Sequence, residues 1–350
     1  MMSHQIKHLL VIRLSAMGDV AMTVPILNAF AKKYPSVKIT VLTRPFFAPL
    51  FSSIPNVKVY EADVKGKHKG IFGLWRLYRS LKTLNIDAIA DLHNVLRSKI
   101  LKTYFLFSGV PFMQIDKGRA DKKALTQEKN KVFTQLKTTH QRYIDVFTKL
   151  GFQLEILSQK DGISRQKLDE ATLKLMGNDS KKWIGIAPFA AFQGKMYPLN
   201  LMKEVVSYLN NTNKYKIIFF GGGKQEEDQL NAWQALFSNS INMAGKLSFA
   251  SELKLISNLD VMLAMDSGNA HLAAMFSIPT VTLWGVTHPY AGFYPFGQAI
   301  ENAILSDRTL YPNIPTSIYG NKVPLGYENV METILPETVH TKVEELLTKN

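Results

Sequence analysis

Short apolar runs alternate with amphipathic stretches along most of the chain. In the first half the apolar runs predict strands at His8–Ile12, Lys38–Leu42, Val57–Tyr60 and Ala88–Leu92. The stretches between and after them have helical spacing and predict helices at Val20–Lys33, Phe46–Ser53, Ile71–Asn85 and Thr139–Leu150. Strands separated by helices of this length predict right-handed βαβ units and a parallel sheet.

The same alternation restarts after a polar stretch. It predicts strands at Trp183–Ala187, Lys216–Phe220, Ile241–Met243, Val261–Ala264 and Thr280–Trp284. The helices predicted between and after them lie at Leu199–Asn210, Glu226–Phe237, Ala250–Asn258, Ala270–Phe276 and Glu337–Lys349. We therefore predict an α/β protein with two Rossmann-like domains, whose parallel sheets face a central cleft. The predicted segments are an N-terminal domain (1–160), a hinge (161–182), a C-terminal domain (183–336) and a C-terminal helix (337–350).

Composition narrows the class of protein. The 350 residues are 46% hydrophobic and include no cysteine, which excludes disulfides, thiolate zinc sites and cysteine catalysis. The first eight residues are polar, and no apolar run reaches the roughly 18–20 residues of a membrane-spanning helix. We therefore expect a cytoplasmic protein.

The positive charge is concentrated in the first half. The net charge is +14, and the segment from Lys65 to Lys137 holds sixteen Lys and Arg residues against five Asp and Glu. Such a segment is either a solvated basic face or a surface for an anionic partner, such as nucleic acid, an anionic membrane or a phosphorylated substrate.

The sequence RLSAMGDVAMTVP, at residues 13–25, directly follows the first predicted strand. A strand, a turn with glycine and a helix usually build a phosphate site, because a helix start offers free N–H groups. Asp19 would repel a phosphate in that turn. It either caps the helix that begins at Val20 or accepts a proton from a substrate hydroxyl.

A second candidate site is the sequence MDSGNAHLAA, which follows the strand at Val261–Ala264. Gly268 allows close approach to the backbone, and the N–H groups of the next helix point at whatever binds there. Asp266 can hold hydroxyl groups beside Ser267. His271, on the first helical turn, is either a phosphate ligand or a structural residue.

Two more loops follow strands of the second half. Lys195 in FQGKMYPLN precedes Pro198 and can pair with a diphosphate on which leaving-group charge develops. The glycines of FFGGGKQEED lack the G-x-G-x-x-G spacing of a dinucleotide site. Glu226 or Glu227 after them either binds a ribose or complements the dipole of a helix start.

No metal-ligand spacing, Walker loop or G-x-S-x-G elbow occurs in the sequence. We expect neither a metal nor a cofactor.

Taken together, IRLSAMGDVAMTVP, GKMYP, AGKLSFASELKLISNLDVMLAMDSGNAHLAA and TLWGVTHP resemble glycosyltransferase family 9, the ADP-heptose:lipopolysaccharide heptosyltransferases. DLHNVLRS and HQRYIDVF also look like segments of the family's first domain. The resemblance covers nearly the whole chain in the expected order. It implies a GT-B fold with the acceptor on the N-terminal domain and the nucleotide sugar on the C-terminal one. It also implies inversion at the anomeric carbon without a catalytic metal.

The resemblance assigns roles to individual residues. Asp19 matches the general base, and Lys195 matches the lysine that contacts the donor's phosphates. The implied donor site comprises Lys195, Glu226 at the ribose, the backbone of Lys246 and Leu247 at the adenine, Asp266, Ser267, Gly268 and His271. The implied acceptor site comprises Arg13, Ser15, Gly18 and Arg97. The loop APFAAFQGK is apolar where the family often has Thr or Ser, so its phosphate contacts would rely on backbone N–H groups.

We therefore expect an inverting, metal-independent transferase that moves a heptose from ADP-heptose to the lipid A–inner core acceptor of lipopolysaccharide. The basic segment would hold the acceptor's anionic groups at the cytoplasmic face of the inner membrane, where the enzyme would be peripheral. The stretch GIFGLWRLYRSL either adds aromatic membrane contact or packs on the sheet. The alternatives are a GT-B enzyme for another nucleotide sugar, an NAD-type oxidoreductase without the glycine fingerprint, and a nucleic-acid-binding protein. No module that combines Lys or Arg with stacking aromatics is present, so we expect no nucleic-acid partner.

Overall fold

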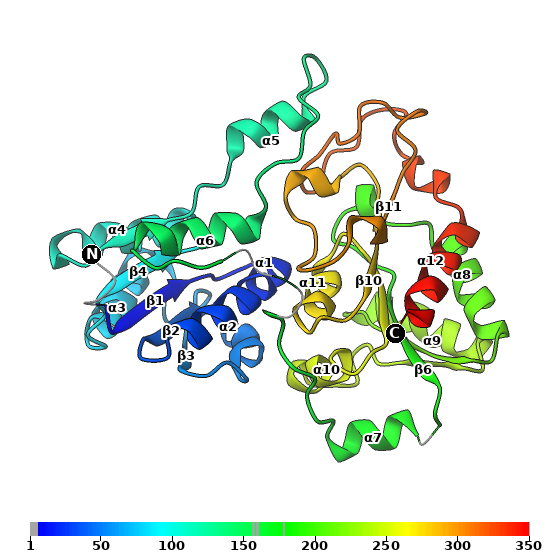
Figure 1. Ribbon diagram of the computed structural model, residues 1–350, viewed down its shortest axis with the longest axis horizontal. Coiled ribbons are helices and arrows are strands. Elements are labelled where there is room, and N and C mark those ends of the chain that lie inside the picture. Colours follow the sequence, from blue (N-terminus) through cyan, green and yellow to red (C-terminus); the bar gives the residue numbers. More distant parts are fainter. Residues whose placement is uncertain (1–5, 156–157, 159–160, 178, 350) are drawn as a thin grey trace. The chain divides into compact units, whose positions relative to one another are not determined.

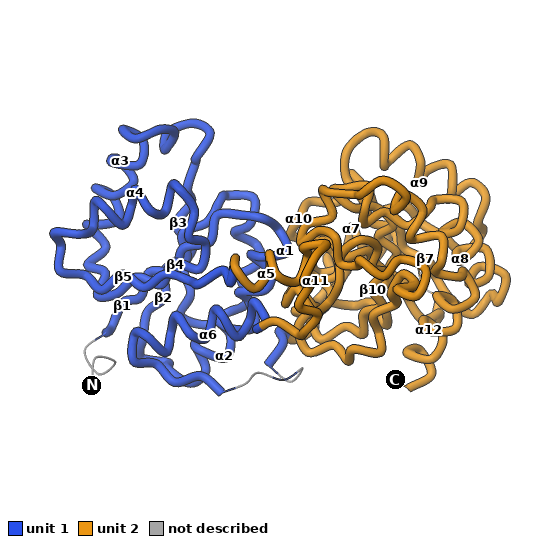
Figure 2. The backbone as a smooth tube through the Cα atoms, turned by 90° about the horizontal axis from the view of Figure 1, so that it is seen from above, with its two compact units in different colours: residues 1–118, 137–163 blue, residues 119–136, 164–350 orange. Residues whose placement is uncertain are grey.

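The chain folds into two compact units, each around its own parallel sheet. The computed structural model describes residues 6–155, 158, 161–177 and 179–349. Unit 1 comprises residues 1–118 and 137–163, and unit 2 comprises residues 119–136 and 164–350 (Figure 2).

Unit 1 contains a five-stranded parallel sheet in the order β3-β2-β1-β4-β5. Its strands are β1 (His8–Ile12), β2 (Lys38–Thr43), β3 (Val57–Glu61), β4 (Ala88–Asp91) and β5 (Phe112–Gln114). Its α-helices are α1 (Met17–Ala21), α2 (Thr23–Lys33), α3 (Gly70–Lys82), α4 (Leu96–Phe105) and α6 (Thr139–Lys149). The 3₁₀ helices are η2 (Pro45–Phe51) and η3 (Leu106–Ser108).

Helices cover both faces of the unit 1 sheet. Strand β1 is buried along its whole length, as expected for a central parallel strand between two helical layers. Alternate residues point to opposite faces, and Leu10 and Ile12 pack with α3 and α4 in one apolar cluster. Helices α2 and α6 pack together on the other side (Figures 1 and 2). The Phe30 and Phe147 rings meet there at 5.2 Å between centroids.

Unit 2 contains a six-stranded parallel sheet in the order β11-β10-β9-β6-β7-β8. Its strands are β6 (Lys182–Ala187), β7 (Tyr215–Phe219), β8 (Ser240–Asn242), β9 (Val261–Met265), β10 (Thr280–Trp284) and β11 (Ala303–Leu305). Its α-helices are α5 (Arg119–Thr126), α7 (Glu170–Met176), α8 (Leu199–Asn211), α9 (Lys224–Leu236), α10 (Phe249–Ile256), α11 (Gly268–Met275) and α12 (Pro336–Thr348). The 3₁₀ helices are η5 (Gln193–Lys195), η6 (Pro289–Ala291), η7 (Ile300–Asn302) and η8 (Val330–Thr333).

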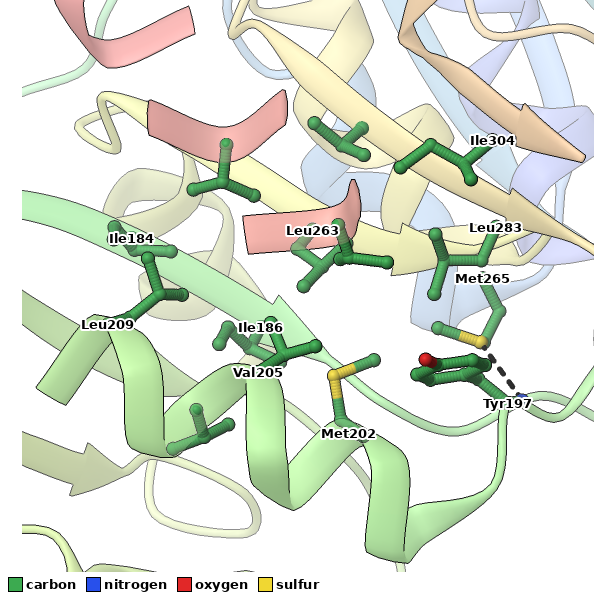
Figure 3. Close-up of a cluster of buried hydrophobic side chains, with 14 of the residues drawn as sticks. Ile184, Ile186, Tyr197, Met202, Val205, Leu209, Leu263, Met265, Leu283 and Ile304 are labelled. Carbon is green, nitrogen blue, oxygen red and sulfur yellow. Dashed lines mark hydrogen bonds between the residues drawn. The ribbon is translucent and has the colours of Figure 1, made fainter. Parts of the chain in front are cut away.

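The core of unit 2 lies where α8 and α12 cover the sheet. Met202, Val205 and Leu209 follow helical spacing along α8 and are fully buried. Figure 3 shows these side chains directed at Ile184 and Ile186 of β6. Burying side chains of this size stabilises a fold by about 1.5–3 kcal/mol each, which fixes the strands whose carboxyl ends carry the candidate site.

The segment 119–136 belongs to unit 2, although the sequence placed it in an N-terminal domain of residues 1–160. Leu125 and Leu136 are buried against Ala291 in a small apolar cluster. The Arg308 guanidinium lies 3.5 Å from the centroid of the Phe133 ring. These contacts explain why residues 119–136 belong to unit 2 although the residues just before and after them belong to unit 1. The predicted basic segment Lys65–Lys137 is therefore divided between the two units.

All nine predicted strands occur, with ends within one residue of those expected. The sequence missed β5 and β11, which have only three residues each, although β8 is an edge strand of the same length and was predicted. It also missed α4 and α5. The predicted hinge contains α7, which the Asp169 side chain caps by accepting a hydrogen bond from the Thr172 N–H at 2.9 Å. The stretch at Phe46–Ser53 is 3₁₀ rather than α-helical.

None of the described helices is long and apolar enough to cross a membrane.

Candidate active site

Asp19 lies at the carboxyl end of β1, within the short helix α1. This helix begins at Met17 rather than at Val20, and Asp19 contributes to its cap from the third helical position, not from the position before the helix. An Arg13 guanidinium nitrogen lies 2.5 Å from Asp19 Oδ2, and the Ala16 N–H donates to the same oxygen at 3.4 Å. The carboxylate is therefore held in one orientation while 28% of its side chain stays exposed.

Arg13 is buried, and its guanidinium has a second partner besides Asp19. Its other terminal nitrogen donates to the Leu92 carbonyl at 2.6 Å, at the end of the neighbouring strand β4. The Tyr143 hydroxyl of α6 donates to the Asp19 backbone carbonyl at 3.1 Å, which ties α1 to the helical layer. Arg13 and Tyr143 thus determine where the Asp19 carboxylate stands.

His93 joins this group, and the sequence analysis did not identify it. The Leu14 N–H donates to His93 Nδ1 at 3.4 Å, so the neutral ring carries its proton on Nε2, which lies 3.5 Å from Ser15 Oγ. Burial, followed by the charge of Arg13, lowers the pKa of His93 to about 3. The signal available in the sequence was its position in DLHN, immediately after a predicted strand.

The other predicted acceptor residues lie around the same strand ends. Ser15 and Gly18 flank Asp19 in the turn and in α1, and Arg97 is exposed on the first turn of α4. The charge of Arg97 also lowers the pKa of His93, although by less than burial does. The structure therefore brings the predicted acceptor residues to one edge of the unit 1 sheet.

A pocket of about 230 Å³ lies at the ends of β2 and β3 in the same unit. Arg44, Phe46, Asp63 and Lys65 are among the residues that line it. The Arg44 side chain donates to the Leu14 carbonyl at 2.9 Å, so one wall of the pocket is attached to the turn that leads to Asp19.

In unit 2, Lys195 and Asp266 form an ion pair at the carboxyl edge of the sheet. Lys195 Nζ lies 2.9 Å from Asp266 Oδ2, and both side chains are largely buried. Lys195 comes from η5 after β6, and Asp266 follows β9, which is the neighbour of β6. The predicted donor-phosphate lysine and the predicted sugar-binding carboxylate are therefore in direct contact.

Two glycines allow the Lys195 loop to pack closely. A Cβ on Gly194 would lie 2.6 Å from Val286 and 2.7 Å from the Gly320 carbonyl. Gly320 has a φ of +78°, which favours glycine, and a Cβ there would lie 2.3 Å from Lys195 Cγ. The Tyr197 N–H also donates to Met265 Sδ at 3.4 Å (Figure 3). The Lys195 stem is thus held by the surrounding backbone.

The start of α11 carries the rest of this site. Ser267 is the N-cap residue and Gly268 the first helical residue, while His271 is buried on the first turn. Ser267 Oγ and Thr287 Oγ1 are buried and have no hydrogen-bond partner among the described residues. Since buried hydroxyls are normally satisfied, both atoms suit a ligand's oxygen atoms. Thr287, in TLWGVTHP, had received no role from the sequence.

The two acidic residues at the start of α9 lie in different surroundings. Glu226 Oε2 accepts a hydrogen bond from the Gly222 N–H at 2.8 Å, so this side chain is bound to the glycine loop that precedes α9. The Glu227 carboxylate lies against Gly245, where a Cβ would come within 2.5 Å of its Oε1. Gly245 directly precedes Lys246 and Leu247, the predicted adenine contact.

Among the described residues, no group of three or more His, Cys, Asp or Glu side chains could hold a metal ion.

The sequence profile of glycosyltransferase family 9 (heptosyltransferase) matches residues 74–314 of this chain. The chain belongs to glycosyltransferase family 9. It is therefore an enzyme of the heptosyltransferase family, as the sequence motifs predicted. The match extends from α3 in unit 1 through the Lys195 loop and α11 in unit 2.

Curated relatives and solved structures agree with this family. The chain is 26% identical to the lipopolysaccharide core heptosyltransferase OpsX of Haemophilus influenzae, over 81% of this chain and 80% of that one. It is 24% identical to lipooligosaccharide heptosyltransferase 2 of the same organism, over 98% and 100%. The structure of E. coli ADP-heptose lps heptosyltransferase II superposes with a TM-score of 0.67 and 20% identity, over 98% and 99%. E. coli heptosyltransferase WaaC with ADP also gives 0.67, with 17% identity over 97% and 99%.

These structural matches confirm the predicted fold class, an α/β protein of GT-B type with two parallel sheets.

Proposed function

We propose that this family 9 enzyme transfers a heptose from ADP-heptose to the lipid A–inner core acceptor of lipopolysaccharide, at the cytoplasmic face of the inner membrane. The observation that carries the proposal is the buried Lys195–Asp266 pair beside the Ser267 hydroxyl, which has no hydrogen-bond partner in the described part of the chain, at the start of α11. In this arrangement one cation, one hydroxyl and helix N–H groups suit a diphosphate, and one carboxylate suits sugar hydroxyls.

In the proposed donor site Lys195 and the N–H groups at Gly268 stabilise the departing diphosphate. The bond between the anomeric carbon and the phosphate oxygen breaks, and ADP leaves with the electron pair. Negative charge then grows on that oxygen, and Lys195 interacts with it more strongly than in the ground state. Asp266 orients Lys195 and binds hydroxyl groups of the sugar, while His271 contacts the phosphates. The residues present thus supply the charge that such a leaving group requires.

Unit 1 supplies the proposed base. The acceptor hydroxyl attacks the anomeric carbon from the face opposite the diphosphate, and Asp19 takes its proton as the new C–O bond forms. Arg13 keeps the carboxylate in place, and Ser15, Gly18 and Arg97 contact the acceptor. Attack from the opposite face inverts the configuration of that carbon.

The pocket beside this turn suits the acceptor's anionic groups. Arg44 and Lys65 bring two cations to it, and Phe46 adds an apolar wall. The one carboxylate of the lining, Asp63, accepts hydrogen bonds from the Gly66 and Lys67 N–H groups. We propose that carboxylates or phosphates of the acceptor bind there. The part of the basic segment that lies in unit 2 is then not needed for the acceptor.

Glu227 is a better candidate for the ribose than Glu226, because it lies beside the loop of Lys246 and Leu247. We expect Glu227→Gln to weaken ADP binding about tenfold, by roughly the strength of one charge-assisted hydrogen bond. Glu226→Gln is the matched variant and should change ADP affinity less than twofold. Calorimetric titration with ADP measures both. A larger loss of ADP affinity in Glu226→Gln than in Glu227→Gln would indicate that Glu226 binds the ribose.

His93 should influence the acid stability of the enzyme. Its pKa falls from 6.5 to about 3 on folding, so between these values the unfolded chain binds a proton that the folded chain does not. Stability is therefore lost as pH falls through this window. His93→Gln, which cannot titrate, should lose less stability between pH 7 and pH 4 than the unmodified protein. Urea unfolding at several pH values measures this, and parallel losses in the two proteins would contradict it.

Selective binding of ADP tests the choice of donor. Thermal unfolding with ADP, UDP, GDP and CMP should show the largest increase in melting temperature with ADP. Stabilisation by UDP without any response to ADP would favour a family 9 enzyme with another nucleotide sugar. Stabilisation by NAD alone would favour an oxidoreductase.

A further inference from the structure

Exposed apolar side chains gather at one end of two helices in unit 1. Among the described residues, seven large apolar side chains of this unit are exposed, and five of them lie on α3 or η3. Ile71, Phe72 and Trp75, at the start of α3, are 64%, 83% and 45% exposed. Leu106 and Phe107, in η3, are 65% and 94% exposed. We call these five residues the aromatic edge.

The aromatic edge is one surface rather than two. Helices α3 and α4 pack side by side in the same layer (Figures 1 and 2). The Tyr104 hydroxyl, near the end of α4, donates to the Ile71 carbonyl at 3.2 Å, and the Tyr104 and Trp75 rings meet at 5.1 Å. Since η3 begins two residues after Tyr104, Leu106 and Phe107 lie at the same end as the start of α3.

Packing on the sheet does not account for these side chains. The inner stripe of α3, formed by Leu74, Leu77 and Leu81, is buried in the core of unit 1. Phe72 and Trp75 lie on the outer stripe at helical spacing. The helix therefore packs on the sheet, as one interpretation of GIFGLWRLYRSL predicted, and still presents two aromatic rings to solvent.

Beyond the aromatic edge, both helices carry positively charged side chains. The cations are Arg76, Arg79 and Lys82 on α3, and Arg97, Lys99 and Lys102 on α4. Neither helix contains an acidic residue. None of the six cations forms an ion pair within the described part of the chain. The surface combines apolar side chains with a net positive rim.

We propose that the aromatic edge inserts into the interface of an anionic lipid bilayer and that the bilayer's headgroups contact the cations of α3 together with Lys99 and Lys102 of α4. Phe, Leu and Trp side chains enter the boundary between headgroups and acyl chains, and Lys and Arg bind anionic lipid. The absence of acidic residues from both helices matches a surface of one charge sign. The inference deepens the proposed function, because the proposed acceptor is itself a lipid.

Flotation with lipid vesicles tests the surface directly. The full chain should bind vesicles of phosphatidylethanolamine with about a quarter phosphatidylglycerol, and should bind phosphatidylcholine vesicles far less. Phe72→Ser with Phe107→Ser should reduce this binding at least about tenfold, since both rings leave the interface. Leu310→Ser with Leu325→Ser removes two exposed apolar side chains from unit 2 and should leave it unchanged.

Charge is tested separately from apolar insertion. Arg76→Gln with Arg79→Gln should reduce vesicle binding about tenfold or more, because each headgroup contact is worth roughly fivefold in affinity at physiological salt. Lys203→Gln with Lys214→Gln, which removes two exposed lysines of unit 2, is the matched control and should not. Equal binding to phosphatidylcholine and to phosphatidylglycerol vesicles would overturn the proposal.

An assay of heptose transfer distinguishes the proposed membrane surface from the proposed function on which it rests. The double Phe variant should transfer heptose to a deacylated, water-soluble acceptor at the unmodified rate, and should bind ADP with unchanged affinity. If vesicle binding falls while even the unmodified protein transfers no heptose, the membrane surface stands and the proposed function fails. Unchanged vesicle binding by the double Phe variant, or capture by duplex DNA in place of vesicles, would overturn the membrane surface.

Discussion

Replacing Asp19 with Asn is expected to reduce the rate of heptose transfer about a thousandfold while ADP affinity stays within a factor of two. The amide keeps the size of the side chain but cannot take a proton from the acceptor hydroxyl, and general-base catalysis contributes roughly 10²- to 10⁴-fold. ADP affinity should not change, because the proposed donor residues lie in unit 2. Rates from product formation and a calorimetric titration with ADP measure the two quantities.

The control for Asp19→Asn is Asp145→Asn. Asp145 also belongs to unit 1 and also pairs with a cation, Lys137, at 2.5 Å, but it lies on α6 outside the proposed site. This variant should transfer heptose at close to the unmodified rate. If Asp19→Asn retains full activity, Asp19 is not the base. If both variants lose activity equally, the loss reflects ion pairs in unit 1 rather than proton transfer.

Replacing Lys195 with Met is expected to lower transfer about a hundredfold and to weaken ADP binding. Removing one group that stabilises leaving-group charge typically costs 10²- to 10³-fold in rate. The variant also leaves Asp266 largely buried without its cation, which should reduce the stability of unit 2 by about 3–5 kcal/mol. Initial rates, ADP titration and urea unfolding measure the three effects.

The double variant Lys195→Met, Asp266→Asn separates catalysis from folding. Because no unpaired charge remains, its stability should return most of the way toward that of the unmodified protein, while transfer stays low. Lys224→Met removes a lysine from an exposed pair with Asp228 and should change neither quantity. Recovery of transfer together with stability would mean that Lys195 acts only through the fold.

The apolar pattern predicted the architecture because every central strand is a short run of buried residues. Strand β1 illustrates this, since all five of its residues are buried and the helices on both faces require that. The elements that the pattern missed, β5 and β11, are short edge strands with part of their surface exposed. Partial burial weakens the local signal without removing it, because β3 and β8 are also partly exposed edge strands and were predicted.

The assignment of residues 119–136 to unit 2 could not be predicted from local pattern. Residues 119–136 follow the first sheet in sequence, yet Leu125 and Phe133 pack with residues near Ala291 in unit 2. Such long-range packing depends on how distant segments meet, and a reading along the chain cannot detect it. For the same reason one basic segment in sequence became two surfaces.

Candidate site residues could be proposed from the loops that follow predicted strands. Asp19, Lys195 and Asp266 were proposed in this way, and the structure puts each at a carboxyl edge of a sheet. The contacts between side chains of distant loops were not predictable. His93 beside Ser15, Glu227 over Gly245 and Gly320 against Lys195 all depend on contacts between distant loops.

The most direct test of the account is the product of a single reaction. The purified enzyme is incubated with ADP-heptose and a deacylated inner-core acceptor, and the product is analysed by mass spectrometry and by NMR of its anomeric proton. We expect an acceptor that is heavier by one heptose, joined with anomeric configuration opposite to that of the donor. The same incubation with Asp19→Asn should yield almost none. A product that retains the donor's configuration, or transfer from a UDP-sugar but none from ADP-heptose, would contradict it.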